Sequence, residues 1–435
     1  MKEIINRFRI FFLRIIKKDL VQVFSFSGVS TLVKMITGIV RTKVVALLLG
    51  PSGVAIIGQM ADILRMTSLV SNAGITQGVT KYIAEFKDDV FKIKQILSTA
   101  FKITLIASIL TGLFLIFFSG FLSNKILLDG SYKSIFIVFG FSIILFAINR
   151  LLLAIINGFK DFKNFIKINI ASNITILFYS VGLIYFFGVY GALLSQVTSQ
   201  SIVLIISIIF IFRSNWFKKQ NFIGSINTST LKQLSGFTLL TIFTFFLGPI
   251  SKIVIRSFLI NGVSIDAAGY WDSTNKVSGL VLQVVTQALT VYLIPRFSEL
   301  KERTLIRKEI LNTYKIIIPI LIISFSAIYI FRDFIISVLY SSEFYPMREL
   351  FLFQFVGDTI KIISWVISIQ LVAKAMIKTL FVTEIFGNIL IVVLSYFFIN
   401  FFGLKGVVYA FTVNYTIYLL MMLFIFRKTL FYRNV

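Results

Sequence analysis

The chain has 435 residues, of which 57% are hydrophobic and only 14% are charged, and its formal net charge is +25. Soluble domains carry about 25% charged residues, so this composition excludes a soluble protein. The sequence contains neither Cys nor His, which excludes disulfides, thiolate or imidazole metal sites and histidine proton relays. Because most basic residues flank apolar runs, the positive charge does not indicate a nucleic-acid-binding protein.

The N-terminal segment is basic and apolar but lacks the long uninterrupted core and the small-residue cleavage site of a signal peptide. We expect a retained interfacial helix over 1–20. After it, apolar runs of about 20 residues recur along the chain, a length that predicts membrane-spanning helices rather than barrel strands of about 10 residues. The twelve expected spans are 21–49, 53–84, 95–118, 133–157, 167–187, 192–212, 232–260, 268–295, 309–331, 348–373, 379–401 and 406–426.

The loops between these spans alternate in charge. Lys and Arg gather in every second loop and in the termini, and the opposite loops are nearly bare, which places both termini in the cytoplasm. Two bare loops, GPSG at 50–53 and GVYG at 188–191, are expected to be tight turns. The longest external loop, around 332–348, is too short for an external domain.

An internal repeat relates the two halves of the chain. QILSTAFKI at 95–103 reappears as EILNTYKI at 309–316, and the turns at Gly191 and Gly406 match. Three cations also recur 211 residues later, and the pairs are Arg41 with Lys252, Arg65 with Lys276, and Arg150 with Lys361. Because each half has an even number of spans, both halves are expected to insert the same way up.

Pseudo-symmetric halves of this kind usually enclose a central cavity and rock about it, which favours transport over catalysis. We therefore expect an all-α polytopic membrane protein with about 12 transmembrane helices, arranged as two six-helix bundles around a central cationic cavity. The expected divisions are an N-terminal bundle at 21–213, a cytoplasmic linker at 214–231, a C-terminal bundle at 232–427 and a tail at 428–435.

The expected spans contain many more Lys and Arg residues than Asp and Glu residues. A cation at the middle of a span costs roughly 2.5–3.5 kcal/mol, so this surplus must be hydrated in a cavity or neutralised by a ligand. Arg binds phosphate oxygens in bidentate geometry and Lys binds them as a point charge, so the lining suits an anionic amphiphile with a diphosphate headgroup. The candidate lining residues are Lys34, Arg41, Arg65, Arg150, Lys252, Arg256, Lys276 and Lys361.

Three span-embedded acids have a cation on the same helical face: Asp62 with Arg65, Asp272 with Lys276, and Asp358 with Lys361. One interpretation is that these are self-neutralised pairs that stabilise helix packing. The other is that the acids change protonation, or bind Na⁺, and so couple transport to an ion. The ion-coupling candidates are Asp62, Asp272, Asp358 and Glu384. Polar residues in the spans, Gln354 among them, are candidates for hydrogen bonds to sugar hydroxyls.

Several segments resemble the Wzx-type flippases of the multidrug and oligosaccharidyl-lipid exporter superfamily. The likeness is carried by STLVKMITGIVRTKVVALLLGPSGV, NAGITQGVTKY, VYLIPRFSEL, EFYPMRELFLFQFVGDTIKIISWVIS and LVAKA, which are spread from residue 30 to 375. Residues that stand where similar proteins keep the same residue types are Lys34, Lys43, Lys81, Asp358, Lys361, Lys374 and Glu384. On this basis Lys43 joins the substrate-binding candidates.

The resemblance implies movement of an undecaprenyl-diphosphate-linked oligosaccharide, for O-antigen or enterobacterial common antigen, across a bacterial inner membrane from the cytoplasmic to the periplasmic leaflet. It implies alternating access, with coupling to H⁺ or Na⁺ proposed for some relatives, and neither covalent chemistry nor a cofactor. Membrane lipids, a polysaccharide polymerase and a chain-length regulator are the implied partners.

Two other classes stay open. A drug or cation antiporter of the same superfamily should have an acidic cavity for its cationic substrates, whereas the cavity expected here is basic. A membrane-embedded polysaccharide polymerase or ligase should carry a sizeable external loop with catalytic basic residues, and the expected loops are short.

Overall fold

The structure, a computed structural model, describes residues 18–212, 214, 216–236 and 238–431. Most of the expected interfacial helix at 1–20 lies outside these ranges. The described residues form helices and turns, with no strand among them, and they pack as two compact units. Unit 1 comprises Met1–Val44 and Thr67–Ile242, and unit 2 comprises Val45–Met66 and Phe243–Val435. The segment Val45–Met66, which the sequence analysis expects in the first bundle, therefore packs with residues of the second half.

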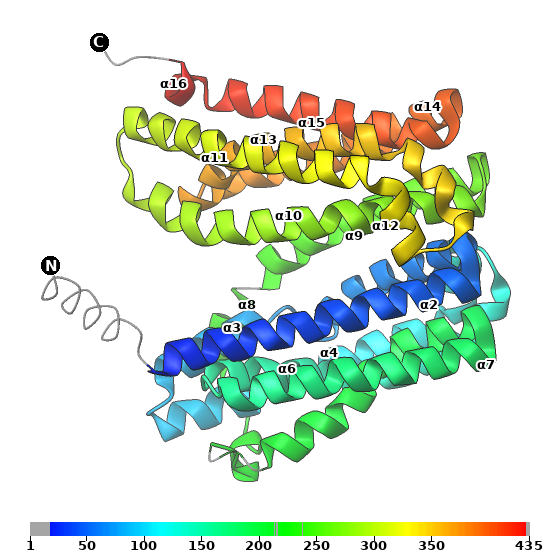
Figure 1. Cartoon of the computed structure of the whole chain (residues 1–435). Coiled ribbons are helices and arrows are strands. Elements are labelled where there is room, and N and C mark those ends of the chain that lie inside the picture. The colour runs from blue at the N-terminus through cyan, green and yellow to red at the C-terminus, as the bar shows by residue number, and fades with distance from the viewer. Residues whose placement is uncertain (1–17, 213, 215, 237, 432–435) are drawn as a thin grey trace, which may run out of the picture. The chain divides into compact units, whose positions relative to one another are not determined.

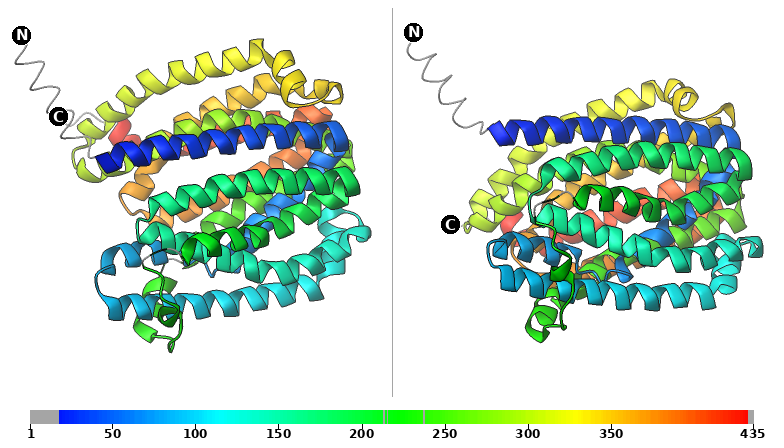
Figure 2. Two further views of the ribbon diagram at one scale, coloured as in Figure 1. Left: turned by 60° about the horizontal axis from the view of Figure 1, so that its bottom comes forward. Right: turned by 90° about the horizontal axis from the view of Figure 1, so that it is seen from below.

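Unit 1 is built around the long helices α4, α6 and α7, with α6 packed against the other two (Figure 1). Its elements are the first part of α2 (Lys18–Val70), α3 (Thr76–Phe86), α4 (Val90–Phe117), α5 (Ser119–Leu122), η1 (Ser123–Leu127), η2 (Gly130–Tyr132), α6 (Lys133–Gly158), α7 (Phe162–Ile211), η3 (Lys219–Phe222) and α8 (Thr228–Ser235). Helix α6 packs against both α4 and α7, and the views in Figure 2 show the same neighbours. Gly112 and Gly140 allow α4 and α6 to approach closely, because a Cβ at Gly112 would lie 2.4 Å from the Gly140 carbonyl oxygen.

The chain after α7 folds back onto unit 1. The Asp161 carboxylate precedes α7 and accepts hydrogen bonds from Ser214 Oγ at 3.0 Å and Trp216 Nε1 at 3.2 Å. The Trp216 ring stacks on Phe159 with centroids 4.8 Å apart. Burial raises the pKa of Asp161, but the hydrogen bonds from Asn164, Ser214 and Trp216 outweigh this effect and hold its pKa below the usual value. An ionised Asp161 therefore ties the central linker to the α6–α7 turn.

Unit 2 is built around α13, which packs against α10, α11 and α15 (Figure 1). Its elements are the segment Val45–Met66 of α2, most of α9 (Thr238–Gly262), α10 (Ile265–Glu299), α11 (Arg303–Ile330), α12 (Arg332–Leu339), η4 (Ser342–Glu349), α13 (Phe351–Ala373), α14 (Ile377–Phe402), η5 (Gly403–Lys405), α15 (Gly406–Ile425) and α16 (Arg427–Leu430). Phe355 stacks on Phe325 of α11, with centroids 4.7 Å apart, and on Phe351 of its own helix, at 5.3 Å. Helix α9 begins in unit 1 and continues in unit 2.

Eight stretches of the described residues are long and apolar enough to cross a membrane, which confirms a polytopic all-α membrane protein. Three of them, of 42, 50 and 49 residues, are much longer than the roughly 20 residues that one crossing needs. Each contains a break at a glycine with positive φ: 62° at Gly50, 56° at Gly188 and 58° at Gly403. The turns predicted at 50–53 and 188–191 are confirmed, and the count of twelve spans stays a prediction.

The expected span 53–84 is not one helix. Helix α2 ends at Val70 and α3 begins at Thr76. Between them Ala73 and Gly74 have φ angles of 48° and 66°, and the left-handed backbone is closed by a hydrogen bond from Gly74 N to the Leu69 carbonyl. A helix cannot continue through two such residues, so the polar NAG sequence makes a turn here.

The internal repeat is confirmed in the backbone. Gly188 and Gly403 share the same unusual conformation, with φ and ψ of 56° and −133° against 58° and −136°. Lys160 and Ala375, at the preceding turns of the two halves, both have positive φ. A Cβ at Gly191 would lie 1.9 Å from a carbonyl oxygen eight residues earlier, and one at Gly406 would lie 2.0 Å from the equivalent oxygen.

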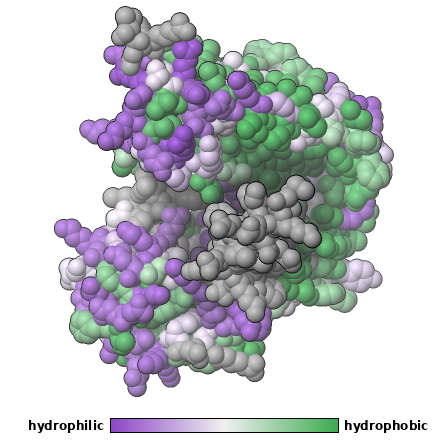
Figure 3. Space-filling view, turned by 60° about the vertical axis from the view of Figure 1, so that its left-hand side comes forward, coloured by the Kyte–Doolittle hydropathy of each residue, from purple (hydrophilic) through white to green (hydrophobic). Residues whose placement is uncertain are grey.

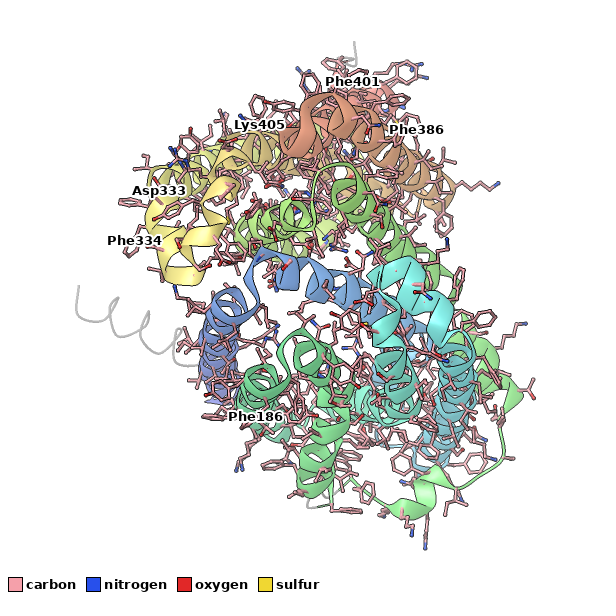
Figure 4. All side chains as sticks on the ribbon, turned by 90° about the vertical axis from the view of Figure 1, so that its right-hand side faces the viewer. Phe186, Asp333, Phe334, Phe386, Phe401 and Lys405 are labelled. Carbon is pink, nitrogen blue, oxygen red and sulfur yellow. The ribbon has the colours of Figure 1, made fainter. Side chains whose placement is uncertain are left out.

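The surface has the pattern of a membrane protein. Figure 3 shows hydrophilic side chains gathered at one end of the helices and hydrophobic side chains along their length. Phe186, Phe334, Phe386 and Phe401 are exposed and lie at the edge of the ribbon in Figure 4. Large apolar side chains exposed in this way suit contact with lipid.

Candidate functional site

The side chain of Arg256, on α9, lies at the centre of a charged cluster within unit 2. Its exposed fraction is 1%. It donates from Nε to Asp272 Oδ2 at 2.7 Å, from Nη2 to Asp62 Oδ2 and Asp272 Oδ1 at 2.9 Å, and from Nη1 to Gln59 Oε1 at 2.6 Å. A buried guanidinium is stable only when its charge is paired and its donors are used, and Arg256 meets both conditions. Arg256 therefore ties α2, α9 and α10 together.

Small residues allow α10 to come close enough to α2 for this network. A Cβ at Gly58 would lie 2.2 Å from Asp272 Oδ2, and a Cβ at Gly269 would lie 2.0 Å from the Pro51 carbonyl oxygen. No side chain fits at either distance. The glycines on α2 and α10 thus set the position of the Asp272 carboxylate.

Asp62 links the buried part of the cluster to an accessible cation. Its Oδ1 accepts a hydrogen bond from Arg65 Nη1 at 3.1 Å, so the predicted Asp62–Arg65 pair is confirmed. The Asp62 side chain is 3% exposed, whereas the Arg65 side chain is 64% exposed. Arg65 is therefore an exposed cation whose guanidinium is bonded through Nη1 to a buried carboxylate.

A second accessible cation, Lys252, lies one helical turn before Arg256 on α9. Its side chain is exposed, and it interacts electrostatically with Asp62, Asp272 and the cations Arg65 and Lys361. Lys252 and Arg65 therefore flank the same pair of buried carboxylates. Two cations beside the same carboxylates can bind one polyanionic group.

Another predicted cation of unit 2, Lys361, lies on α13. Its Nζ lies 5.2 Å from the ring centroid of Tyr415 and 5.7 Å from that of Phe411, both on α15. It also interacts with Asp358, one turn earlier, and with Glu384 on α14. The predicted Asp358–Lys361 pair is electrostatic, and no N–O separation of 4 Å or less is recorded for it among the described residues.

The other predicted site residues lie in different environments. Asp272 is hydrogen-bonded to Arg256, while Lys276, with which a pair was expected, is an exposed residue of α10. Lys34 and Arg41 of α2 and Arg150 of α6 are exposed residues of unit 1, and Lys43 of α2 is half-buried there. Unit 2 thus brings together the predicted residues Asp62, Arg65, Lys252, Arg256, Asp272, Lys361, Asp358 and Glu384.

Three participants were missed by the sequence analysis: Gly58, Gln59 and Tyr415. Gln59, Asp62 and Arg65 recur every three residues, and this spacing on an apolar helix could have revealed Gln59. Nothing local distinguishes Gly58 or Tyr415, because their roles arise from contacts with other helices. No group of three or more Asp or Glu side chains in the described ranges could hold a metal ion.

Comparisons with known proteins agree with this architecture. The lipid III flippases of Escherichia coli K12 and Shigella flexneri are each 28% identical over 395 residues, which cover 90% of this chain and 94% of the relative. An inward-facing multidrug resistance transporter of the MATE family and MOP superfamily superposes with a TM-score of 0.74 at 16% identity, covering 91% of this chain and 94% of that one. The lipid II flippase MurJ, in an inward closed conformation, superposes with a TM-score of 0.70 at 17% identity, covering 93% and 87%.

The helical fold and the charged cluster define a polytopic membrane protein with the fold of MOP-superfamily transporters. The family model for polysaccharide biosynthesis proteins matches residues 20–301. The chain belongs to this family. The predicted resemblance to lipid-linked oligosaccharide flippases is thereby confirmed.

Proposed function

We propose that this protein is a flippase that moves undecaprenyl-diphosphate-linked oligosaccharide from the cytoplasmic to the periplasmic leaflet of a bacterial inner membrane. The observation that carries the proposal is the pair of accessible cations, Arg65 and Lys252, over a buried Asp62–Arg256–Asp272 network. The relatives that are named lipid III flippases support the same class of substrate.

A diphosphate is the ligand that these cations suit best. The fork of Arg65 can bind two phosphate oxygens, and Lys252 supplies a compact charge beside it. Asp62 holds Arg65 in place, and the buried guanidinium of Arg256 keeps Asp62 in place. A cationic drug would gain nothing from this lining, so the drug antiporter is the weaker reading. The oligosaccharide would cross with the diphosphate while the polyprenyl chain stays in lipid, and no bond of the substrate would change.

The remaining candidates complete the proposal. Lys34, Arg41, Lys43 and Arg150 of unit 1 and Lys276 of unit 2 would contact the headgroup during alternating access. The Lys and Arg bias of the loops favours cytoplasmic termini. On the periplasmic side a polysaccharide polymerase and a chain-length regulator would use the translocated unit.

The acids divide into two groups with respect to ion coupling. Asp62 and Asp272 are both hydrogen-bonded to Arg256, and Asp62 also accepts a hydrogen bond from Arg65, so two guanidinium groups balance these two carboxylates. Within the part of the chain that the structure describes, Asp358 and Glu384 both interact with the single cation Lys361. We therefore favour Asp358 and Glu384 as the groups that take up H⁺ or Na⁺ during transport.

Deletion and complementation test the function. A strain that lacks the protein should accumulate undecaprenyl-diphosphate-linked repeat units on the cytoplasmic face, measured by mass spectrometry of the lipid extract. Wild-type protein and the Lys301→Glu variant, which changes an exposed residue of the α10–α11 connection, should restore surface polysaccharide, whereas Lys252→Glu should not. Unchanged surface polysaccharide in the deletion strain, together with a new drug sensitivity, would establish the antiporter instead.

A further inference from the structure

A polar side chain of α7, Gln200, is held in place by a chain of hydrogen bonds inside unit 1. Ser207 Oγ donates to Asn149 Oδ1 at 2.7 Å, and Asn149 Nδ2 donates to Gln200 Oε1 at 2.9 Å. Ser207 and Asn149 are completely buried, whereas Gln200 is half-buried. Hydrogen bonds that run in one direction in this way polarise one another, so the chain fixes which atom of the Gln200 amide meets Asn149.

The chain uses the oxygen of the Gln200 amide and leaves its nitrogen. Within the described residues Gln200 makes no other hydrogen bond, and its nitrogen is not among the buried atoms that lack a partner. The nitrogen is therefore accessible, and it carries two uncharged donors. Ser207 and Asn149 alone would be enough to join α6 to α7. The extension of the chain to Gln200 positions a donor for something else.

Gln200 lies on an inward face of unit 1. The exposed apolar residue Ile209 follows it on α7 by nine residues, about two and a half helical turns, so the two side chains lie on opposite faces. Phe141 and Arg150, both exposed residues of α6, have the same spacing. Because Phe141 and Ile209 suit lipid and a span-embedded arginine does not, water or a ligand must reach the opposite faces.

The internal repeat supports the same orientation. Gly191 and Gly406 are equivalent glycines of the two halves, with the same close approach to a carbonyl eight residues earlier. Gln200 follows the first by nine residues, and Tyr415 follows the second by nine. The Tyr415 ring centroid lies 5.2 Å from the Lys361 amino group. The helix face that meets a cation in unit 2 therefore carries an uncharged amide in unit 1.

We propose that the amide nitrogen of Gln200 donates hydrogen bonds to a sugar residue of the lipid-linked oligosaccharide, so that this face of α7 is a saccharide subsite. The proposal rests on the proposed function. An uncharged donor suits the hydroxyl and acetamido oxygens of a sugar, whereas a diphosphate is bound more strongly by cations such as Arg65 and Lys252. Unit 2 would thus hold the diphosphate, and unit 1 would select the saccharide attached to it.

Binding of two lipids to the purified full-length protein in detergent tests the subsite. One is the undecaprenyl-linked repeat unit extracted from the deletion strain, and the other is undecaprenyl diphosphate, which lacks sugar. Gln200→Met should weaken binding of the first about three- to tenfold, the effect of one uncharged hydrogen bond, and should change binding of the second less than about twofold. Gln233→Met makes the same change at an exposed residue of α8 and should bind both lipids like the wild type.

A second variant, Gln200→Glu, separates a ligand contact from a structural role. Glutamate keeps an oxygen for Asn149 but has no amide nitrogen, so the bond between α6 and α7 persists while the donors are lost. It should lose affinity for the glycosylated lipid as Gln200→Met does. Size-exclusion profiles would establish that each variant is folded, and Gln200→Glu carries the test if Gln200→Met does not fold.

The two lipids also separate failure of the subsite from failure of the function. If the wild type binds both lipids, an equal loss of affinity for both in a folded Gln200 variant, or no loss for either, would overturn the saccharide subsite and leave the flippase function standing. Folded wild-type protein that binds neither lipid would instead contradict the flippase function, and the subsite would be overturned with it.

Discussion

Asp62 and Arg256 are 194 residues apart in sequence, yet Arg256 Nη2 donates to Asp62 Oδ2 at 2.9 Å inside unit 2. Both side chains are almost completely buried. The second oxygen of Asp62 bonds the exposed Arg65. Asp62 therefore bonds both a buried cation, Arg256, and an exposed cation, Arg65. Substitution of Arg256 should affect stability, whereas substitution of Arg65 should affect transport.

Substitution of the buried cation should destabilise the protein. Arg256→Gln leaves Asp62 and Asp272 buried without their shared charge partner, and breaking a buried ion pair costs about 3–5 kcal/mol. We expect a clearly lower melting temperature in detergent, measured by nanoscale fluorimetry. The triple variant Arg256→Met, Asp62→Asn, Asp272→Asn removes the uncompensated charges and should recover part of the loss. Wild-type stability in Arg256→Gln would show that the network is not structural.

Substitution of the accessible cation should instead affect transport. Arg65→Gln removes a side chain that is 64% exposed, so the melting temperature should stay close to that of the wild type. Complementation should fall by at least tenfold, because the proposed diphosphate ligand loses its bidentate partner. Arg65→Lys keeps the charge but not the fork geometry and should give an intermediate result. Equal activity in all three proteins would remove Arg65 from the site.

A single methyl group at Gly58 should disturb the cluster. Its Cβ would lie 2.2 Å from Asp272 Oδ2, so α2 and α10 must separate or the Asp272–Arg256 bonds must break. We expect Gly58→Ala to cost about 1–3 kcal/mol of stability. Gly38→Ala is the matched control, since a Cβ there meets no atom within 4 Å and alanine favours a helix. A melting temperature equal to that of Gly38→Ala would contradict the close packing.

The linker contact at Asp161 should depend on pH. The folded pKa of Asp161 lies below its usual value of about 3.9, so ionised Asp161 stabilises the folded linker above that pH. This stabilisation is lost as the pH falls through the folded pKa. The protection factor for hydrogen exchange of the segment that contains Trp216, which compares its rate with the intrinsic rate at the same pH, should therefore fall below about pH 4.

The variant Asp161→Ala supplies the comparison. It should exchange faster already at pH 7, since it loses both the bonds to Ser214 and Trp216 and an N-cap worth about 1 kcal/mol. Its protection factor should then change little as the pH falls below about 4, unlike that of the wild type. A wild-type segment that exchanges at the same rate as this variant at pH 7 would show that the carboxylate does not anchor the linker.

Local sequence patterns predict much of this fold for physical reasons. Apolar length predicts the spans, and glycines mark the turns at Gly50 and Gly188 because glycine adopts a positive φ with little steric cost. Helical spacing also predicts the Asp62–Arg65 pair. Spacing does not reveal the bond between Asp272 and Arg256, whose Nε lies 2.7 Å from Asp272 Oδ2, because the two residues are on different helices. Contacts between helices that are distant in sequence leave no local signal.

The assignment of Val45–Met66 to unit 2 bears on how the two halves could be exchanged or separated. The carboxylate of Asp62, which neutralises Arg256, is encoded in the first half of the gene. Consider a recombinant that joins the second half of this chain to the first half of another family member. It would contain the buried Arg256 guanidinium, but its first half need not supply an acid at the position of Asp62. The sequences of the two halves are therefore expected to change together during evolution rather than independently.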